Sequence, residues 1–307
     1  MEEASSSDPR PHTERWAYRW LYNARIFAFA SAFYGLLGRR GFHVVTRAVA
    51  CLYTATQPAI TGIVRRNLAL LGGEPTHEEA EAVFFNYATV LADYVAVGAM
   101  SDPQALALCG AFEGREHLES AMKGGNGVIL ATGHLGFFEF GVVVLGSLGL
   151  PVTVATLPEP STSLTAWRAK WRSRWGCDTV EVGADPFSSL GVNRALAAGR
   201  LVAVLADRPI SDHGIEVSLP GGRSLFSTTP AMLSFMTGAP VVPVVVTRRG
   251  DGRYRVAAFP AIRAERSGHD SKHAEIARAT HAIADALFRE IENYPEQWFQ
   301  FVPVQCA

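Results

Sequence analysis

Several chemical signatures are missing from this sequence of 307 residues, and each absence excludes a class of protein. Only four cysteines are present, and they form neither a Cys-x-x-Cys pair nor a metal-binding spacing. This scatter predicts inert thiols in a reducing compartment. The zinc motif His-Glu-x-x-His is absent, so a zinc hydrolase is not expected. A formal net charge of −1 gives no overall reason to expect nucleic acid as a partner.

Acidic residues are missing from one long segment near the N-terminus. Between Arg15 and Leu70 there is no Asp or Glu, whereas eight arginines are present. An anionic membrane surface attracts such a segment with roughly 1 kcal/mol per basic side chain. A solvated basic face and a nucleic-acid patch are the alternatives, and the apolar runs between the arginines favour the membrane.

A long hydrophobic run is also missing. The longest candidate, Ile26–Leu37, has 12 residues, whereas a helix that spans a bilayer needs roughly 20. We therefore predict a helix that lies in the membrane interface, with a buried core helix as the alternative. The N-terminus lacks the basic start of a cleavable signal peptide, so none is expected.

From Gly127 onward, short apolar runs alternate with helical stretches. The predicted buried strands are Val128–Thr132, Val152–Leu157, Thr179–Val182, Leu201–Ala206, Val241–Thr247 and Tyr254–Pro260. The predicted helices are Phe140–Leu148, Ser163–Trp175, Phe187–Ala198, Pro230–Thr237 and Ser271–Asn293. This alternation predicts an α/β fold with a mixed, largely parallel sheet flanked by helices.

The chain divides into three parts by composition. Residues 1–14 are polar and Ser-rich and predict a disordered tail. Residues 15–122 predict an N-terminal helical, membrane-associated region, in which Thr76 and Glu79 match a capping box. Residues 123–307 predict the α/β core, which we expect to form one continuous domain with residues 40–122.

The strongest chemical signal lies where the first predicted strand ends. His134 follows a glycine there, and Glu139 lies five residues later. Five residues of regular helix turn through roughly 500°, so the two side chains meet only if His134 precedes the first turn. Gly133 and Gly136 give the backbone that freedom. In this geometry Glu139 accepts a hydrogen bond from the imidazole, and His134 takes a proton from a substrate hydroxyl. A structural histidine is the alternative.

Charged residues elsewhere are candidates for substrate binding. Asp207 and Arg208 follow a predicted strand, and ligands of open α/β sheets collect beyond the carboxyl ends of strands. A turn with a simple Asp–Arg pair is the alternative. Arg223 lies in the Gly-rich stretch 221–224, which we interpret as a loop before a helix N-terminus that could hold a phosphate. An ordinary capped helix is the alternative there.

A basic and aromatic helix gives one more candidate. Arg168 lies between Trp167 and Trp171, and the tryptophans at 167, 171 and 175 fall on one helical stripe. A half-buried helix with a solvated basic side is the default interpretation. A second contact with the membrane or with a carrier protein is the alternative.

Several motifs resemble one enzyme family. Gly114–Glu119 followed by Gly127–Glu139 is similar to the late acyltransferases of bacterial lipid A biosynthesis, and to their relatives that acylate phosphatidylinositol mannosides. Those enzymes share the motif His-x-x-x-x-Asp/Glu, matched here by His134 and Glu139. Three further segments match in order, at Ile63–Leu70, Thr237–Pro243 and Pro295–Trp298.

The resemblance implies an O-acyltransferase in which His134 and Glu139 are catalytic and no covalent enzyme intermediate forms. The donor would be acyl-CoA or an acyl-carrier protein thioester, the acceptor a lipid or glycolipid hydroxyl, and no metal or other cofactor is required. Phe137 and Phe138 stand where the family commonly has Asn-Trp, and we include both as substrate-binding candidates.

Together with the basic segment, this predicts a peripheral protein on the cytoplasmic side of the cell inner membrane. Membrane lipids would be its partners, with no role for nucleic acid. A soluble secondary-metabolite alcohol as acceptor, or a noncatalytic lipid-binding relative, are the alternatives.

Overall fold

The computed structural model describes residues 24–159, 161–183, 189–209, 214–265 and 271–304. The predicted disordered tail, residues 1–14, therefore lies outside the described residues, as do residues 15–23 of the predicted membrane segment.

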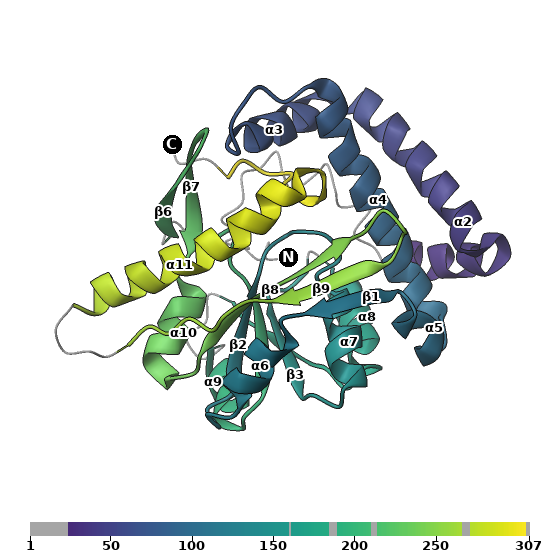
Figure 1. Cartoon of the computed structure of the whole chain (residues 1–307). Coiled ribbons are helices and arrows are strands. Elements are labelled where there is room, and N and C mark those ends of the chain that lie inside the picture. Colours follow the sequence, from purple (N-terminus) through teal and green to yellow (C-terminus); the bar gives the residue numbers. More distant parts are fainter. Residues whose placement is uncertain (1–23, 160, 184–188, 210–213, 266–270, 305–307) are drawn as a thin grey trace, which may run out of the picture.

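A seven-stranded sheet forms the centre of the described chain (Figure 1). Its strands, in sheet order, are β1 (Cys109–Glu113), β9 (Tyr254–Ala258), β8 (Val241–Arg248), β2 (Val128–Thr132), β5 (Leu201–Leu205), β3 (Val152–Thr156) and β4 (Asp178–Glu181). Only the β8–β9 pair is antiparallel; the other neighbours run parallel. The predicted α/β fold with a mixed, largely parallel sheet is confirmed.

Helices cover both faces of this sheet. Alternate residues of the central strand β2 point to opposite faces, where they pack against different helices. Val128 and Leu130 belong to one buried apolar cluster, and Ile129 and Ala131 belong to another. The first cluster is shared with α4 (His77–Ala99), α6 (Arg115–Met122), α7 (Phe140–Ser147) and α8 (Thr162–Ser173). The second is shared with α9 (Ser189–Ala197), α10 (Thr229–Thr237) and α11 (Lys272–Asn293). A strand buried on both faces explains the nearly continuous apolar run in its sequence.

Two parts of the sequence prediction need correction. The region 15–122 is not wholly helical, because β1 lies within it and pairs with β9. The stretch 221–224 is not a flexible loop. It forms the turn and start of an antiparallel hairpin, β6 (Gly214–Leu219) with β7 (Gly222–Ser227), whose tip packs against the end of α3 (Pro58–Ala69) through Gly221 N–H to Leu70 O at 2.9 Å. Hairpin pairing satisfies backbone groups that a loop would leave to water.

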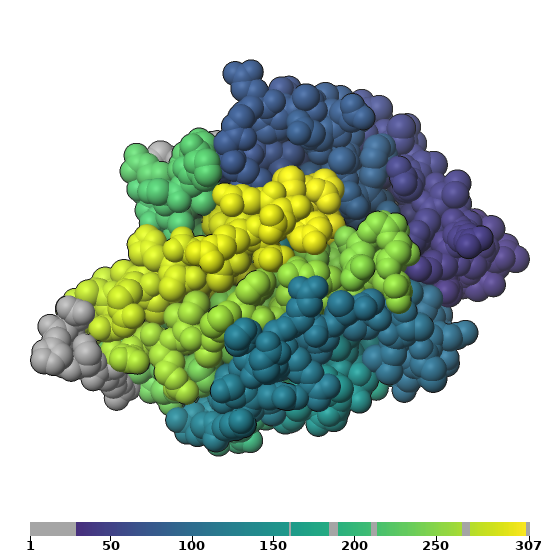
Figure 2. Space-filling view, viewed as in Figure 1, coloured from purple at the N-terminus to yellow at the C-terminus, as the bar shows by residue number. Residues whose placement is uncertain are grey.

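Helix α2 (Ala24–Thr56), in purple, forms the rim of the molecule at the right of Figures 1 and 2, and α3 lies at the top of Figure 1. Helix α2 kinks at Gly38, whose φ of 63° is open to glycine at little cost. Helix α4 starts with the predicted capping box: Glu79 N–H donates to Thr76 Oγ1 at 3.1 Å, and Thr76 N–H donates to Glu79 Oε2 at 2.7 Å. Of the described helices, only α4 is long and apolar enough to cross a membrane, and most of it is buried inside the protein.

Helix α2 exposes large apolar side chains on its outer face. Its inner face carries Arg39, His43 and Thr54 together with the buried Phe42 and Ala50. The exposed apolar residues are Phe29, Leu36, Leu37, Val44, Val45, Val49 and Leu52. Phe29 and Leu36 are 73% and 78% exposed, so the alternative of a fully buried core helix at Ile26–Leu37 does not describe this segment.

Candidate active site

The segment between β2 and α7, residues 133–139, forms a tight loop that we call the His134 loop. Gly136 has a φ of 58°, and a Cβ there would lie 2.1 Å from the carbonyl oxygen of Val246, so only glycine fits. Its N–H donates to the Gln297 carbonyl at 2.8 Å, and the Phe137 N–H donates to the Val246 carbonyl at 2.9 Å. The loop is thereby fixed between β8 and the C-terminal segment.

His134 is paired with the carboxylate of Asp207. Its Nδ1 lies 2.8 Å from Asp207 Oδ1, and its backbone N–H donates to Asp207 Oδ2 at 2.8 Å. The strands β2 and β5 are parallel neighbours, so their carboxyl ends bring the two residues together. Gly133 makes the approach possible, because a Cβ there would lie 3.2 Å from the Asp207 carboxyl carbon.

Asp207 is fully buried and surrounded by donors. Besides His134, Trp298 Nε1 donates to its Oδ2 at 3.2 Å and Gln300 Nε2 at 2.7 Å. Burial raises the pKa of this carboxyl, but the charge of His134 and the hydrogen bonds from His134 and Trp298 outweigh burial and lower the pKa to about 2. Asp207 is therefore an ionised acceptor at any ordinary pH.

This arrangement fixes the chemistry that the imidazole can perform. An ionised carboxylate only accepts, so Nδ1 must carry the proton that it shares with Asp207, and Nε2 is left with a free lone pair. The His134 side chain is 20% exposed, whereas Asp207 is not exposed at all. A histidine with one nitrogen oriented by a buried carboxylate and a partly open ring is the arrangement of a general base.

Glu139 has a different partner from the one predicted. Its carboxylate forms a two-pronged ion pair with Arg172 of α8, with Arg172 Nε 3.0 Å from Glu139 Oε2 and Arg172 Nη2 on Glu139 Oε1. Burial raises the pKa of Glu139, yet the neighbouring charges of Arg172 and Arg168 and the Arg172 hydrogen bond lower it overall. The prediction that Glu139 is the hydrogen-bond partner of His134 is wrong, because Asp207 occupies that position. A catalytic contribution of Glu139 stays a prediction.

The remaining substrate-binding candidates on and beside the His134 loop differ in their exposure to solvent. Phe138 is half-buried, with its ring centroid 6.0 Å from that of His134. Phe137 is 1% exposed and packs among Tyr94, Phe140 and Tyr254, so it is a core residue in this structure. Arg208 follows Asp207 and is exposed. Asp207 itself is fully buried and contacts His134, so it does not reach solvent.

Two candidate arginines are engaged with carboxylates. Arg168 pairs with Glu159 at 2.7 Å, and its charge lowers the pKa of Glu139. Arg223 lies on strand β7, exposed and 2.6 Å from Glu216 of the neighbouring strand. The structural basis for its predicted phosphate contact, a loop leading into a helix N-terminus, is wrong.

Comparison with known proteins places the chain in a family. A model of the bacterial lipid A biosynthesis acyltransferases matches residues 5–303. The chain belongs to this family. Its predicted membership, made from the five motif segments, is confirmed.

Two curated relatives of the chain share one name. Phosphatidylinositol mannoside acyltransferase of Mycolicibacterium smegmatis is 28% identical over 196 residues, which cover 62% of this chain and 61% of that protein. The protein of the same name from Mycobacterium tuberculosis is 27% identical over 198 residues, covering 63% of this chain and 59% of its own length. The chain thus matches about three fifths of the length of these relatives.

Three members of the site in this acyltransferase-family chain were missed from sequence. Arg172 lies on the helix that was predicted to be half-buried with a solvated basic side, yet it is 2% exposed. Trp298 and Gln300 come from a segment more than 90 residues away from Asp207. The motif Pro295–Trp298 was a usable signal, because its position in the family pattern suggests a fixed role. The sequence alone does not show which side chain this motif contacts.

Proposed function

We propose that this protein is an O-acyltransferase that moves a fatty acyl group from an acyl thioester to a hydroxyl of a membrane glycolipid. The acceptor oxygen attacks the thioester carbonyl carbon and a C–O bond forms. The C–S bond then breaks, and the thiol leaves with the proton that His134 has taken from the hydroxyl. The substrate alcohol itself attacks, so no enzyme nucleophile and no covalent intermediate are required.

One observation carries this proposal. His134 Nδ1 lies 2.8 Å from the fully buried Asp207, which orients the ring and stabilises the imidazolium that forms when Nε2 takes a proton. The proposal therefore assigns the orienting role to Asp207. Glu139, held by Arg172, is assigned to shaping the loop that carries His134.

The acceptor class is inferred from two independent features. The curated relatives are phosphatidylinositol mannoside acyltransferases. The outward face of α2 is apolar, with Leu36 and Val44 78% and 69% exposed, and this suits a protein that meets its acceptor at a lipid surface. This second feature favours a membrane glycolipid over a soluble alcohol. Acyl-CoA and an acyl-carrier protein are both proposed as donors.

The same helix supports peripheral attachment to the cytoplasmic side of the inner membrane. Arg40 and Arg47 are exposed beside the apolar face of α2, and residues 15–70 contain no acid. Such a helix lies in the plane of an anionic interface, with its apolar side chains in the acyl boundary.

Co-sedimentation with vesicles tests the attachment. Binding should require anionic lipid and weaken at high salt. Val49→Glu, on the exposed apolar face, should weaken it, while Arg253→Glu, on the exposed turn between β8 and β9, should not. Equal binding to neutral and anionic vesicles at every salt concentration would remove the electrostatic part of the proposal.

Loss of the base tests the chemistry. His134→Ala should remain folded and lose about 10²–10⁴ in rate, because that is the usual contribution of a general base. Turnover and melting temperature should be measured on the same preparation. A folded variant with near-normal turnover would remove His134 from the mechanism.

A further inference from the structure

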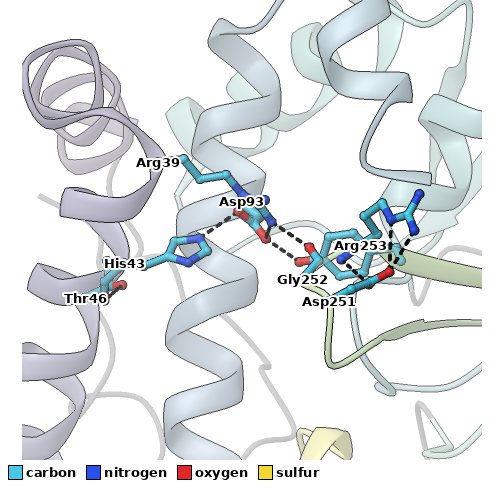
Figure 3. A network of polar contacts seen from close by, with 8 residues as sticks. Arg39, His43, Thr46, Asp93, Asp251, Gly252 and Arg253 are labelled. Carbon is cyan, nitrogen blue, oxygen red and sulfur yellow. Dashed lines mark hydrogen bonds and ion pairs between the residues drawn. The ribbon is translucent and has the colours of Figure 1, made fainter. Parts of the chain in front are cut away.

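A buried carboxylate outside the candidate active site joins three elements of the fold. Asp93 of α4 is fully buried, and Arg39 of α2 holds it through Nε at 2.8 Å and Nη2 at 2.9 Å. His43 Nε2 lies 2.8 Å from the same carboxylate, and the Tyr254 hydroxyl donates to it at 2.6 Å. Figure 3 shows Arg39 and His43 reaching Asp93 from α2. Burying such a charge brings no general gain in stability over apolar packing.

Tyr254 connects this carboxylate to the His134 loop. The Tyr254 ring lies 5.3 Å from that of Phe137 in the loop, and both side chains are almost wholly buried. Tyr94, the neighbour of Asp93 on α4, lies 5.8 Å from the same Phe137 ring on an edge-to-face geometry. Phe137 is thereby held from two sides by residues whose positions Asp93 and α4 determine.

Tyr94 also contacts helix α8, which carries the ion-pair partner of Glu139 at the end of the loop. The Tyr94 ring also lies 4.5 Å from that of Trp171, on helix α8. The next residue of α8, Arg172, carries the ion pair with Glu139. His134 and Glu139 therefore flank Phe137, which packs against Tyr94 of α4.

Arg39 connects the same carboxylate to α2. It directly follows the kink at Gly38, and its Nη2 also donates to the Gly252 carbonyl at 2.9 Å, in the turn between β8 and β9. Arg39 thus joins α2, α4 and that turn at one point. On both sides of the kink, the outward face of α2 is the apolar surface that the proposed function assigns to the membrane.

We propose that Asp93 is a positioning residue: with Arg39 and Tyr254 it holds Phe137, and through Phe137 it fixes the His134 loop relative to α2. The expected effect on the rate rests on the proposed function, whereas the positioning of the loop does not. A small displacement of the loop moves His134 Nε2 relative to the acceptor hydroxyl, and a misplacement of 1 Å can cost about 10²-fold in rate.

Tyr254→Phe is the most selective test, because it removes the hydroxyl that bonds to Asp93 and keeps the ring that packs on Phe137. We expect kcat to fall about tenfold, the lower end of what a lost hydrogen bond to a charged group produces. The KM for acyl-CoA should stay within about twofold, because Tyr254 is fully buried. Arg39→Lys, which keeps the charge but cannot bridge Asp93 and Gly252 together, should lower kcat less than Arg39→Gln.

Tyr294→Phe is the matched control. Tyr294 ends α11 and, among the described residues, has neither a hydrogen bond to Asp93 nor a ring contact with Phe137. Its variant should have wild-type kinetics. An unchanged kcat in Tyr254→Phe, an equal loss in the control, or a loss that only follows the unfolded fraction would overturn the proposal.

Hydrogen exchange separates this inference from the proposed function. The Phe137 N–H, bonded to the Val246 carbonyl, should exchange about tenfold faster in Tyr254→Phe than in the wild type. This readout needs no substrate. If the wild type transfers no acyl chain, the proposed function fails while exchange still decides the positioning role; unchanged exchange rejects that role even in an active enzyme.

Discussion

Asp207→Asn is the substitution whose effect the structure defines most closely. Oδ2 of Asp207 accepts three N–H groups, from the His134 backbone, Trp298 and Gln300. An asparagine must place its single oxygen where those donors converge. Its NH2 group then points at His134 Nδ1, which has to accept rather than donate. The ring proton moves to Nε2, and the base is lost.

The expected loss comes from the missing charge and from the wrong tautomer. The charge of His134 and the hydrogen bonds from His134 and Trp298 outweigh burial and lower the pKa of Asp207 to about 2, so the wild-type carboxylate is ionised when the imidazolium forms. Loss of a general base typically costs about 10²–10⁴ in rate. The equivalent change in a Ser–His–Asp triad costs about 10⁴ in kcat. We expect kcat to fall by about 10²–10⁴.

The assay is thiol release from an acyl thioester in the presence of acceptor, with melting followed on the same protein. Asp207→Asn should stay folded, because the side chain keeps its shape and its buried oxygen keeps its donors. A folded variant with kcat within about threefold of the wild type would refute the assignment of Asp207 as the residue that orients His134.

Three further predictions follow from the charged pairs. Glu139→Gln leaves Arg172 charged and buried, so the protein should lose about 3 kcal/mol of stability, and Glu139→Leu combined with Arg172→Met should recover much of it. The kcat of the folded Glu139→Gln fraction should fall less than that of Asp207→Asn. The reverse order would restore Glu139 as the main partner of His134. For Asp93, burial raises the pKa, but the hydrogen bonds from Arg39 and His43 and the charge of Arg39 lower it to about 2. This folded value lies below the unfolded value of about 3.9, so the carboxylate stabilises the protein above pH 4 and loses that effect as the pH falls toward 2. The difference in Tm between wild type and Asp93→Asn should therefore shrink between about pH 4 and pH 2, and a constant difference contradicts the shift. Arg223→Ala removes an exposed ion pair worth at most about 1 kcal/mol, so kcat and KM should change less than about fivefold; a larger rise in KM would support the phosphate contact predicted from sequence.

The sheet could be predicted because its strands are buried on both faces. Val128–Thr132 is apolar at almost every position, and its bounds match β2. The edge strand β1 and the hairpin β6–β7 have mixed burial, so their sequences carry no clear alternation or apolar run. Pairing with distant partners such as β9 determines these strands, and the local sequence does not record it.

The sequence predicted which residues form the candidate site better than it predicted the contacts between them. His134, Glu139 and Asp207 were all singled out, but the local spacing suggested a His134–Glu139 hydrogen bond. The structure pairs each with a residue 33 or more positions away, Arg172 for Glu139 and Asp207 for His134. Because β2 and β5 are parallel and end side by side, they place His134 next to Asp207, although Glu139 is closer to His134 in the sequence. Likewise, the role of Asp93 depends on Arg39 and Tyr254, 54 and 161 residues away.

The central claim is acyl transfer to a glycolipid hydroxyl by the His134–Asp207 pair, and mass spectrometry of the acceptor tests it directly. Purified protein should be incubated with acyl-CoA and with phosphatidylinositol mannoside in anionic vesicles, and in a parallel series with the acyl-carrier protein thioester. The account predicts an acceptor heavier by one acyl chain, with one thiol released per product, and almost no product with His134→Ala or Asp207→Asn. No acylated lipid with either donor, or equal product from the folded His134→Ala variant, would contradict it.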